Sequence, residues 1–251
     1  MIETIASTAL AVNENLLIQK QRIQSGKNKT RLSLVTGTHG DELEGQYLAW
    51  LLGSFLNQHL DELDGIVDIY PALNPMGIDS ITRSVPMFDI DMNRIFPGTK
   101  HGTMMEVICS SIVNDLAGSD VCIDVHSSNI FLKEIPQIRI SVPTAEMLVP
   151  YAKLMNVDFI WVHESATVLE STLAHTLNTR GTKTLVVEMG VGMRITKEYG
   201  QQIFDGIMNL MHHLGMWKGE INPVSRSRSG WKKKLSLFLR GNFFVPDPRA
   251  G

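Results

Sequence analysis

The stretch RLSLVTGTHGDELEGQYLAWLLGSFL, residues 31–56, joins a strand to a helix through a short polar turn. Residues 31–36 alternate apolar and polar side chains, which is typical of a β-strand. Residues 42–56 carry apolar side chains at helical spacing, from Leu43 through Leu48 and Leu52 to Phe55. This strand–turn–helix unit is the building block of an α/β fold.

The rest of the chain repeats this alternation of strand and helix, which predicts a mostly parallel sheet covered by helices. We therefore expect a three-layer αβα fold with a mixed, mostly parallel central sheet. The other expected strands are 16–24, 66–73, 121–125, 138–142, 158–162 and 183–188, and the other expected helices are 102–116, 145–155, 169–178 and 196–215.

The composition is that of an ordinary globular protein. The chain has 251 residues, 43% of them hydrophobic and 20% charged, with 23 basic and 26 acidic side chains and a net charge of −3. These values exclude a disordered scaffold and argue against a nucleic-acid partner, which would favour a basic excess. Cys109 and Cys122 belong to no CxxC pair, so the sequence predicts neither a disulfide framework nor a thiolate metal site.

The expected location is the cytoplasm, because the start of the chain lacks the basic and apolar regions of a secretory signal. No stretch reaches the ~18 uninterrupted apolar residues of a membrane span, so no membrane partner is expected.

The sequence pattern of the chain changes after residue 220. We expect residues 1–220 to form the catalytic domain, and residues 221–251 to form a polar linker and the start of an incomplete C-terminal β domain. An unfinished β segment would allow edge pairing with a second subunit, so a homo-oligomer is a further possibility.

Side chains able to bind a metal follow several of the predicted strands. His39 and Glu42 follow the strand 31–36, His126 follows 121–125, and Glu188 ends 183–188. Parallel α/β sheets bind ligands at the carboxyl ends of their strands, so these residues should converge. For His39 and Glu42 alone, a loop histidine and a favourable acid at a helix N-terminus would be the better interpretation.

His126 makes a metal site the better interpretation, because a third ligand would complete the two-histidine, one-glutamate set of a catalytic zinc site. In residues 121–126, alternation places Val121, Ile123 and Val125 on one face and Cys122, Asp124 and His126 on the other. Asp124 could then orient His126, since an acid inside an apolar strand needs a partner. An ordinary contact of Asp124 with a helix end or a loop is the alternative.

Glu188 ends a strand that looks buried, so its carboxylate should be functional or paired. It could act as a base beside a metal, and a structural ion pair, for example with Arg194, is an equal alternative. The long loop 74–100 adds Arg83, Asn93 and Arg94. Arginine suits both bidentate carboxylate binding and oxyanion stabilisation.

Four motifs appear in a fixed order between about residues 32 and 190: GTHGDELEG, LNPMGIDSITRSVPMFDIDMNRIFPG, DVHSS and VVEMG. Together they resemble the succinylglutamate desuccinylase/aspartoacylase family of zinc carboxypeptidase-like proteins. The resemblance implies one zinc ion per chain, and it implies hydrolysis of the amide bond of a small N-acylated amino acid.

The resemblance also implies a role for each site residue. His39, Glu42 and His126 match the zinc ligands, and Glu188 matches the general base and acid. Arg83 matches the arginine that polarises the scissile carbonyl, while Asn93 and Arg94 match the pair that binds the substrate carboxylate. Two alternatives stay open: a zinc carboxypeptidase acting on peptides, and a binding protein without catalytic activity.

Overall fold

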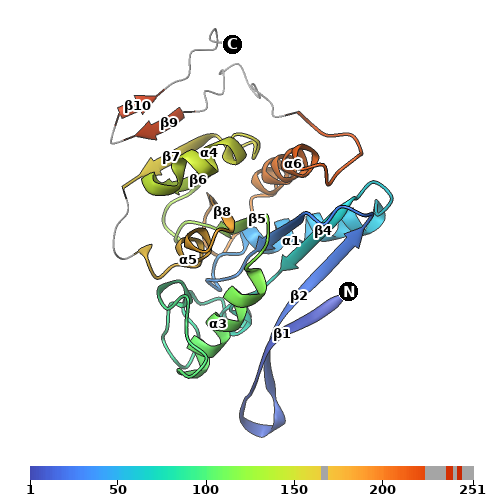
Figure 1. Cartoon of the computed structure of the whole chain (residues 1–251). Helices are drawn as coiled ribbons and strands as arrows, with labels where there is room; N and C mark the ends of the chain where they lie inside the picture. Colours follow the sequence, from blue (N-terminus) through green and yellow to red (C-terminus); the bar gives the residue numbers. More distant parts are fainter. Residues whose placement is uncertain (165–168, 224–235, 240–241, 245–251) are drawn as a thin grey trace.

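A mixed sheet of ten strands runs through the protein, as seen in a computed structural model that describes residues 1–164, 169–223, 236–239 and 242–244 (Figure 1). The order across the sheet is β1 (Ile2–Ala9), β2 (Asn15–Ser25), β4 (Gly65–Tyr70), β3 (Arg31–Val35), β5 (Val121–His126), β8 (Lys183–Gly190), β6 (Glu134–Ser141), β7 (Phe159–His163), β9 (Ser236–Leu239) and β10 (Asn242–Phe244). The four strands β4, β3, β5 and β8 are parallel neighbours, and β2 and β6 flank them in antiparallel pairing.

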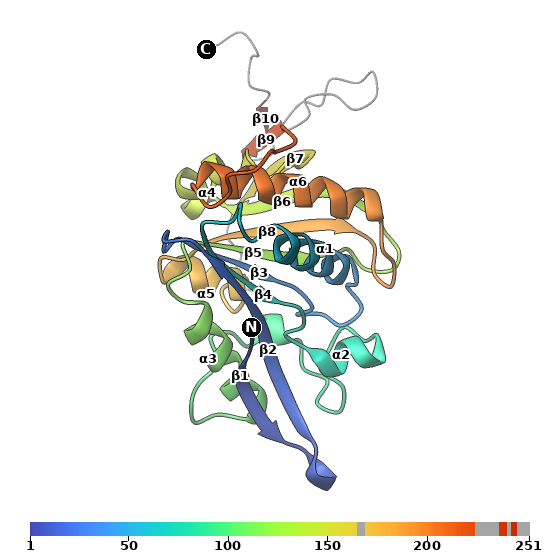
Figure 2. The ribbon, with the colours of Figure 1, turned by 90° about the vertical axis from the view of Figure 1, so that its right-hand side faces the viewer.

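Helices cover both faces of this sheet (Figures 1 and 2). One face is covered by α1 (Glu44–Gln58), α4 (Ala145–Ala152) and α6 (Lys197–His213), and the other by α3 (Met104–Leu116) and α5 (Leu173–Thr179). Short helical turns lie in the connections: η1 (Ala11–Asn13), α2 (Pro75–Ser80), η2 (Met92–Arg94) and η3 (Val142–Thr144). The expected three-layer fold with a mixed, mostly parallel sheet is confirmed.

The alternation in β5 decides which face carries the chemistry. Val121, Ile123 and Val125 pack in the hydrophobic cluster formed with α1, α4 and α6. Cys122 packs in the other cluster, with residues of α3 and α5. Asp124 and His126 have the same parity as Cys122 and therefore belong to the face that α3 and α5 cover. The predicted division of this strand into two faces is confirmed.

The sequence patterns did not predict β1, and they placed the start of β6 at residue 138 instead of Glu134. No side chain of β1 is buried, because this strand is an outer arm paired only with β2, so it lacks an apolar stripe. In β6, Pro136 lies at an irregularity in the pairing with β8, where a residue without an N–H is tolerated.

Much of the expected C-terminal segment, residues 221–251, lies outside the described residues. Within the described part, β9 pairs in parallel with β7, and β10 pairs with β9. The division of the chain after residue 220 therefore stays a prediction. Of the helices in the described ranges, none combines the length and the apolar character that crossing a membrane requires.

Candidate metal and active site

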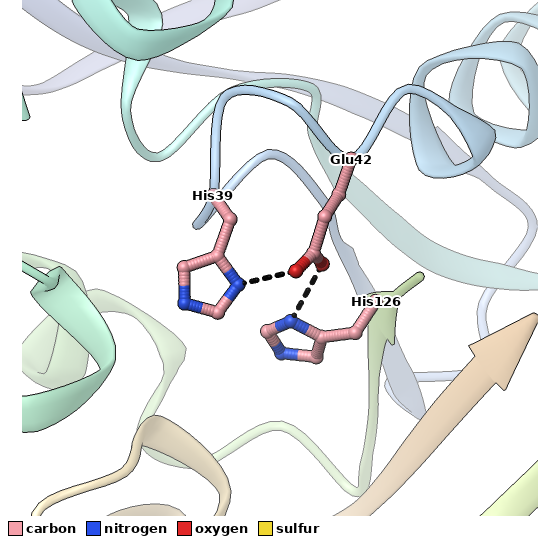
Figure 3. Close-up of side chains that lie close together, drawn as sticks. All are labelled: His39, Glu42 and His126. Carbon is pink, nitrogen blue, oxygen red and sulfur yellow. Dashed lines mark hydrogen bonds and ion pairs between the residues drawn. The ribbon is translucent and has the colours of Figure 1, made fainter. Parts of the chain in front are cut away.

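The Glu42 carboxylate lies between His39, in the loop after β3, and His126, the last residue of β5 (Figure 3). His39 Nδ1 lies 2.7 Å from Oε1 and His126 Nδ1 lies 3.1 Å from Oε2. The backbone N–H of Ser127 donates to Oε2 at 2.9 Å. All three side chains are buried, with at most 5% of each exposed. The predicted convergence of the ends of β3 and β5 is thus present in the structure.

Two glycines allow the turn that presents His39 and Glu42. Gly37 has a φ of 66°, a left-handed conformation that glycine adopts without strain. A Cβ atom on Gly40 would lie only 1.9 Å from the carbonyl carbon of Gly77. The loop after β3 can therefore pack against α2 only with glycine at position 40.

The three side chains fit a divalent metal ion by the chemistry of their donors. One ligand atom from each lies within 4.8 Å of the other two. The opposite ring nitrogens face carboxylates: His39 Nε2 lies 3.0 Å from Asp91 Oδ1, and His126 Nε2 lies 3.2 Å from Asp124 Oδ1. Without a metal, Nδ1 of each histidine donates to Glu42; a carboxylate at Nε2 would keep the ring proton there when Nδ1 gives up its own proton to bind a metal.

The charge state of Glu42 also suits a ligand. Burial alone would raise the pKa of this carboxyl, but hydrogen bonds with His126 and His39 outweigh burial and hold the pKa far below its usual value. Glu42 is therefore an anion in the folded protein, and an anionic oxygen with two imidazole nitrogens is a donor set that zinc accepts.

Glu188 stands two residues before the end of β8 (Lys183–Gly190), beside the end of β5, where its partner in the strand register is His126. Burial raises its pKa to about 7, against the lowering effects of His126 and Arg139. Its ion-pair partner is Arg139 of β6, with Nη1 3.2 Å from Oε1, rather than the Arg194 suggested as an example. A glutamate with a pKa near neutrality can both accept and return a proton.

The long loop contributes two arginines in different settings. Arg83 Nη1 donates to Glu42 Oε1 at 2.9 Å, and its guanidinium also lies 3.6 Å from Asp91 Oδ2. Arg94 is exposed, and within the described residues it has no carboxylate partner; its Nη1 donates to the carbonyl of Asn93. Arg94 is thus free to bind an anion from solution.

Asn93 is held by the helix on the other side of the pocket. Its Oδ1 accepts a hydrogen bond from the backbone N–H of Leu173, at the start of α5. This contact orients the amide and leaves its Nδ2 group to donate to a ligand. Asn74, which also follows a strand, instead caps α2 by accepting from the N–H of Gly77.

One cavity of about 650 Å³ is lined by all seven predicted site residues. The residues that sequence reasoning missed are Asp91, Glu134 and Arg139. Asp91 stands only two positions before Asn93, so its place on the same loop was a usable signal. Glu134 and Arg139 offered none, because their approach to Glu188 depends on how β6 pairs with β8.

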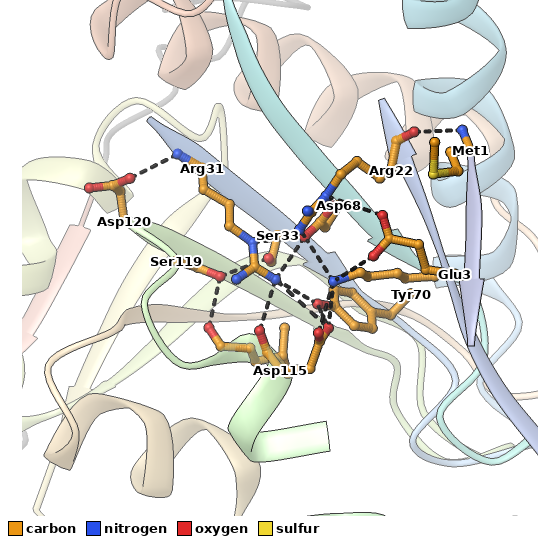
Figure 4. A network of polar contacts seen from close by, with 12 residues as sticks. Met1, Glu3, Arg22, Arg31, Ser33, Asp68, Tyr70, Asp115, Ser119 and Asp120 are labelled. Atoms are coloured by element: carbon orange, nitrogen blue, oxygen red, sulfur yellow. Dashed lines mark hydrogen bonds and ion pairs between the residues drawn. The ribbon is translucent and has the colours of Figure 1, made fainter. Parts of the chain in front are cut away.

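A second cluster of buried charges lies away from this cavity, between the sheet and α3 (Figure 4). Asp68 has no exposed side-chain surface and accepts from Arg22 and Arg31, with Nε at 2.7 Å in each case. Lys20 lies 3.4 Å from Asp68 and 2.8 Å from Asp115. Every charge in this cluster has a partner, so we interpret it as structural.

We expect Asp68→Ala to destabilise the protein by about 3–5 kcal/mol, because it leaves buried cations without their anion. Glu3→Ala is the matched control: Glu3 lies at the partly exposed rim of the same cluster, and its loss should cost about 0–1 kcal/mol. Denaturant unfolding of both variants measures the difference. Equal losses of unfolding free energy would show that the buried contacts of Asp68 stabilise the protein no more than the partly exposed contacts of Glu3.

The fold and the site together define the class of protein. A metallo-carboxypeptidase from Burkholderia cenocepacia superposes with a TM-score of 0.65 at 12% identity, covering 85% of this chain and 64% of its own. That likeness shows the fold alone, and the fold is carboxypeptidase-like.

The chain belongs to the succinylglutamate desuccinylase/aspartoacylase family, whose catalytic-domain model matches residues 28–214. A family structure from Rhodobacter sphaeroides superposes with a TM-score of 0.77 at 25% identity, covering 94% of this chain and 72% of that chain. The N-alpha-acetyl-L-2,4-diaminobutyric acid deacetylase of Halomonas elongata is 30% identical over 213 residues, which are 79% of this chain. The matched region spans 58% of the length of that deacetylase.

Proposed function

We propose that the protein is a zinc-dependent hydrolase of the deacylase kind, which cleaves the amide bond of an N-acylated amino acid or a similar small carboxylate-bearing molecule. The observation that carries the proposal is that three features share one cavity: a cluster able to bind a metal, a glutamate whose pKa is near neutrality, and an arginine that has no carboxylate partner among the described residues. The deacetylase activity of the Halomonas relative favours a bond of this type.

In this proposal His39, Glu42 and His126 hold the zinc ion, which when bound supplies a Lewis acid at the centre of the cavity. Glu188 takes a proton from the attacking water and returns it to the leaving amine. Arg83 stabilises the negative charge that develops on the scissile carbonyl oxygen.

Substrate binding is the proposed task of the loop 74–100. Arg94 pairs with the substrate carboxylate, and the Asn93 amide donates a second hydrogen bond to the same group. Since Arg94 has no carboxylate partner among the described residues, binding an anion costs it no existing ion pair.

The test is a panel of N-acyl amino acids and dipeptides, incubated with the full chain before and after zinc chelation. We expect turnover of N-acyl amino acids that chelation abolishes and added zinc restores. Cleavage of peptides only would favour the carboxypeptidase alternative. Absence of turnover across the panel with zinc bound would favour a binding protein and contradict the proposal.

Arg94→Met should raise KM about 10–100-fold for carboxylate substrates, since a charge-assisted pair contributes about 1.5–3 kcal/mol. The kcat value should change little, because Arg94 contacts the substrate away from the scissile bond. The primary amide of the same substrate is the control, as its KM should be similar in the variant and the wild type. An unchanged KM for the carboxylate would remove Arg94 from the binding site.

A further inference from the structure

Three charged side chains, Glu188, Arg139 and Glu134, lie in a row along the wall of the cavity. Arg139 Nη1 lies 3.2 Å from Glu188 Oε1, and Nη2 of the same guanidinium lies 2.8 Å and 2.9 Å from the two oxygens of Glu134. The exposed fractions of the side chains are 13% for Glu188, 30% for Arg139 and 17% for Glu134. Arg139 is thus held between two carboxylates at the border of the cavity.

The register of β6 against β8 places Arg139 within reach of Glu188. Arg139 pairs with Val186 and Gln137 pairs with Glu188, so Arg139 and Glu188 share one face of the sheet as diagonal neighbours. Long side chains at such diagonal positions reach one another. This contact is therefore built into the strand pairing.

An irregularity in β6 brings Glu134 to the same face. With strict alternation Glu134 and Arg139 would lie on opposite faces, because they are five positions apart in the sequence. Between Glu134 and Gln137 the register shifts by one residue, so that Glu134 pairs with Gly190. A one-residue shift moves a side chain to the other face of its sheet. The bulge thereby supplies Arg139 with its second carboxylate.

The indole of Trp161 supports the guanidinium from the next strand. Arg139 and Trp161 are paired residues of β6 and β7, and the guanidinium carbon lies 5.4 Å from the centre of the ring system. A cation over an aromatic face is attracted to it. Arg139 is thus held in place by the carboxylate of Glu134 and by the ring of Trp161. Arg94, by contrast, has no carboxylate partner among the described residues.

We infer that Arg139 is a positioning residue for Glu188, with Glu134 as its anchor, an inference that rests on the proposed function. The ion pair with Arg139 is made through Oε1 of Glu188, and in this inference Oε2 accepts the proton of the attacking water. The proton then passes from Oε2 to the amine nitrogen as the carbon–nitrogen bond breaks. The guanidinium keeps its own protons throughout and fixes the direction in which the carboxylate faces.

A second role would compete with this one. An arginine in a cavity can also bind a second carboxylate on the substrate, such as that of a dicarboxylic acyl group. Here Arg139 already has two carboxylate partners, so binding a third would require it to leave one of them. We therefore favour positioning, and the two roles differ in which kinetic constant depends on Arg139.

The test compares Arg139→Met, Arg139→Lys and Glu134→Gln with the wild type in zinc content, kcat and KM on an N-acyl amino acid that the wild type hydrolyses. Arg139→Met should keep its zinc and lose about 10–100-fold in kcat at a similar KM, the usual scale for residues that orient a reacting group. Arg139→Lys should recover part of the loss, and Glu134→Gln should lose less than Arg139→Met. Lys218→Met is the matched control, because it breaks a surface ion pair with Asp64 far from β6.

Crystal structures of the wild type and of Arg139→Met give a second readout that does not depend on turnover. The Glu188 carboxylate should leave its position when the guanidinium is absent. An unmoved carboxylate, or an unchanged kcat, would overturn the inference, and a raised KM with normal kcat would assign Arg139 to substrate binding instead. If the wild type hydrolyses nothing, the proposed function fails, and the position of Glu188 in the two crystals still tests the contact.

Discussion

Glu188→Gln is expected to lower kcat by a factor of about 10²–10⁴ while the protein keeps its zinc. A glutamine has nearly the same shape and can still accept from Arg139, but it cannot take a proton from water at neutral pH. The metal cluster does not include Glu188, so elemental analysis should find the same zinc content in the variant and the wild type. Near-normal turnover with zinc retained would refute the assignment of Glu188 as the base.

The same variant should be more stable than the wild type when both are free of metal and above pH 7. Burial raises the pKa of Glu188 from 4.5 in the unfolded chain to about 7 in the folded protein, so ionisation of this group opposes folding. The cost begins near pH 4.5 and is complete above about pH 7, where it is on the order of 3 kcal/mol. Thermal unfolding with a chelator at pH 5 and at pH 8 measures it, and the rise in Tm should be much larger at pH 8 than at pH 5.

These two effects together would identify Glu188 as a residue kept for chemistry at the expense of stability. A structural ion pair with Arg139 is the competing interpretation, and it predicts the opposite sign. If the pair were mainly stabilising, replacing the charged carboxylate would lower Tm at pH 8. The comparison of stability at two pH values therefore separates the two roles without an activity assay.

The parts of the fold that follow from local patterns could be predicted. The alternation in β5 placed Asp124 and His126 on one face, and the stretch 31–56 indicated a short polar turn at His39. Such features depend on a few neighbouring residues, whose backbone geometry the sequence determines directly. The convergence of His39 with His126 then follows from the parallel order of the strands.

The contacts that could not be predicted all depend on register or on the course of a long loop. Asp91 reaches His39 across 52 positions of sequence, and only the path of the loop 74–100 brings it there. Arg139 reaches Glu188 because β6 runs antiparallel to β8, and a bulge next to Pro136 brings Glu134 to the same face. A strand pattern gives neither the direction nor the register of its partner, so these orienting residues emerge only in three dimensions.

Replacing either histidine of the cluster should abolish zinc binding and hydrolysis together. His39→Ala and His126→Ala each remove one of three protein ligands, and a catalytic zinc site with only two is not expected to keep its ion. Elemental analysis after dialysis should give one zinc per chain for the wild type and less than about a tenth of that for either variant. The exposed His212 of α6 is the control, since His212→Ala should keep both zinc and activity.

The two variants should differ in stability once the metal has been removed, because the carboxylates behind the histidines differ in burial. Asp124 is 1% exposed, so His126→Ala leaves a buried carboxylate without its imidazole partner. The side chain of Asp91 is 23% exposed, so after His39→Ala water can replace the lost contact. Chelator-treated His126→Ala should therefore unfold at a lower denaturant concentration than His39→Ala. Full zinc occupancy in either variant would show that the replaced histidine is not a ligand, and equal stabilities would show that Asp124 does not depend on His126.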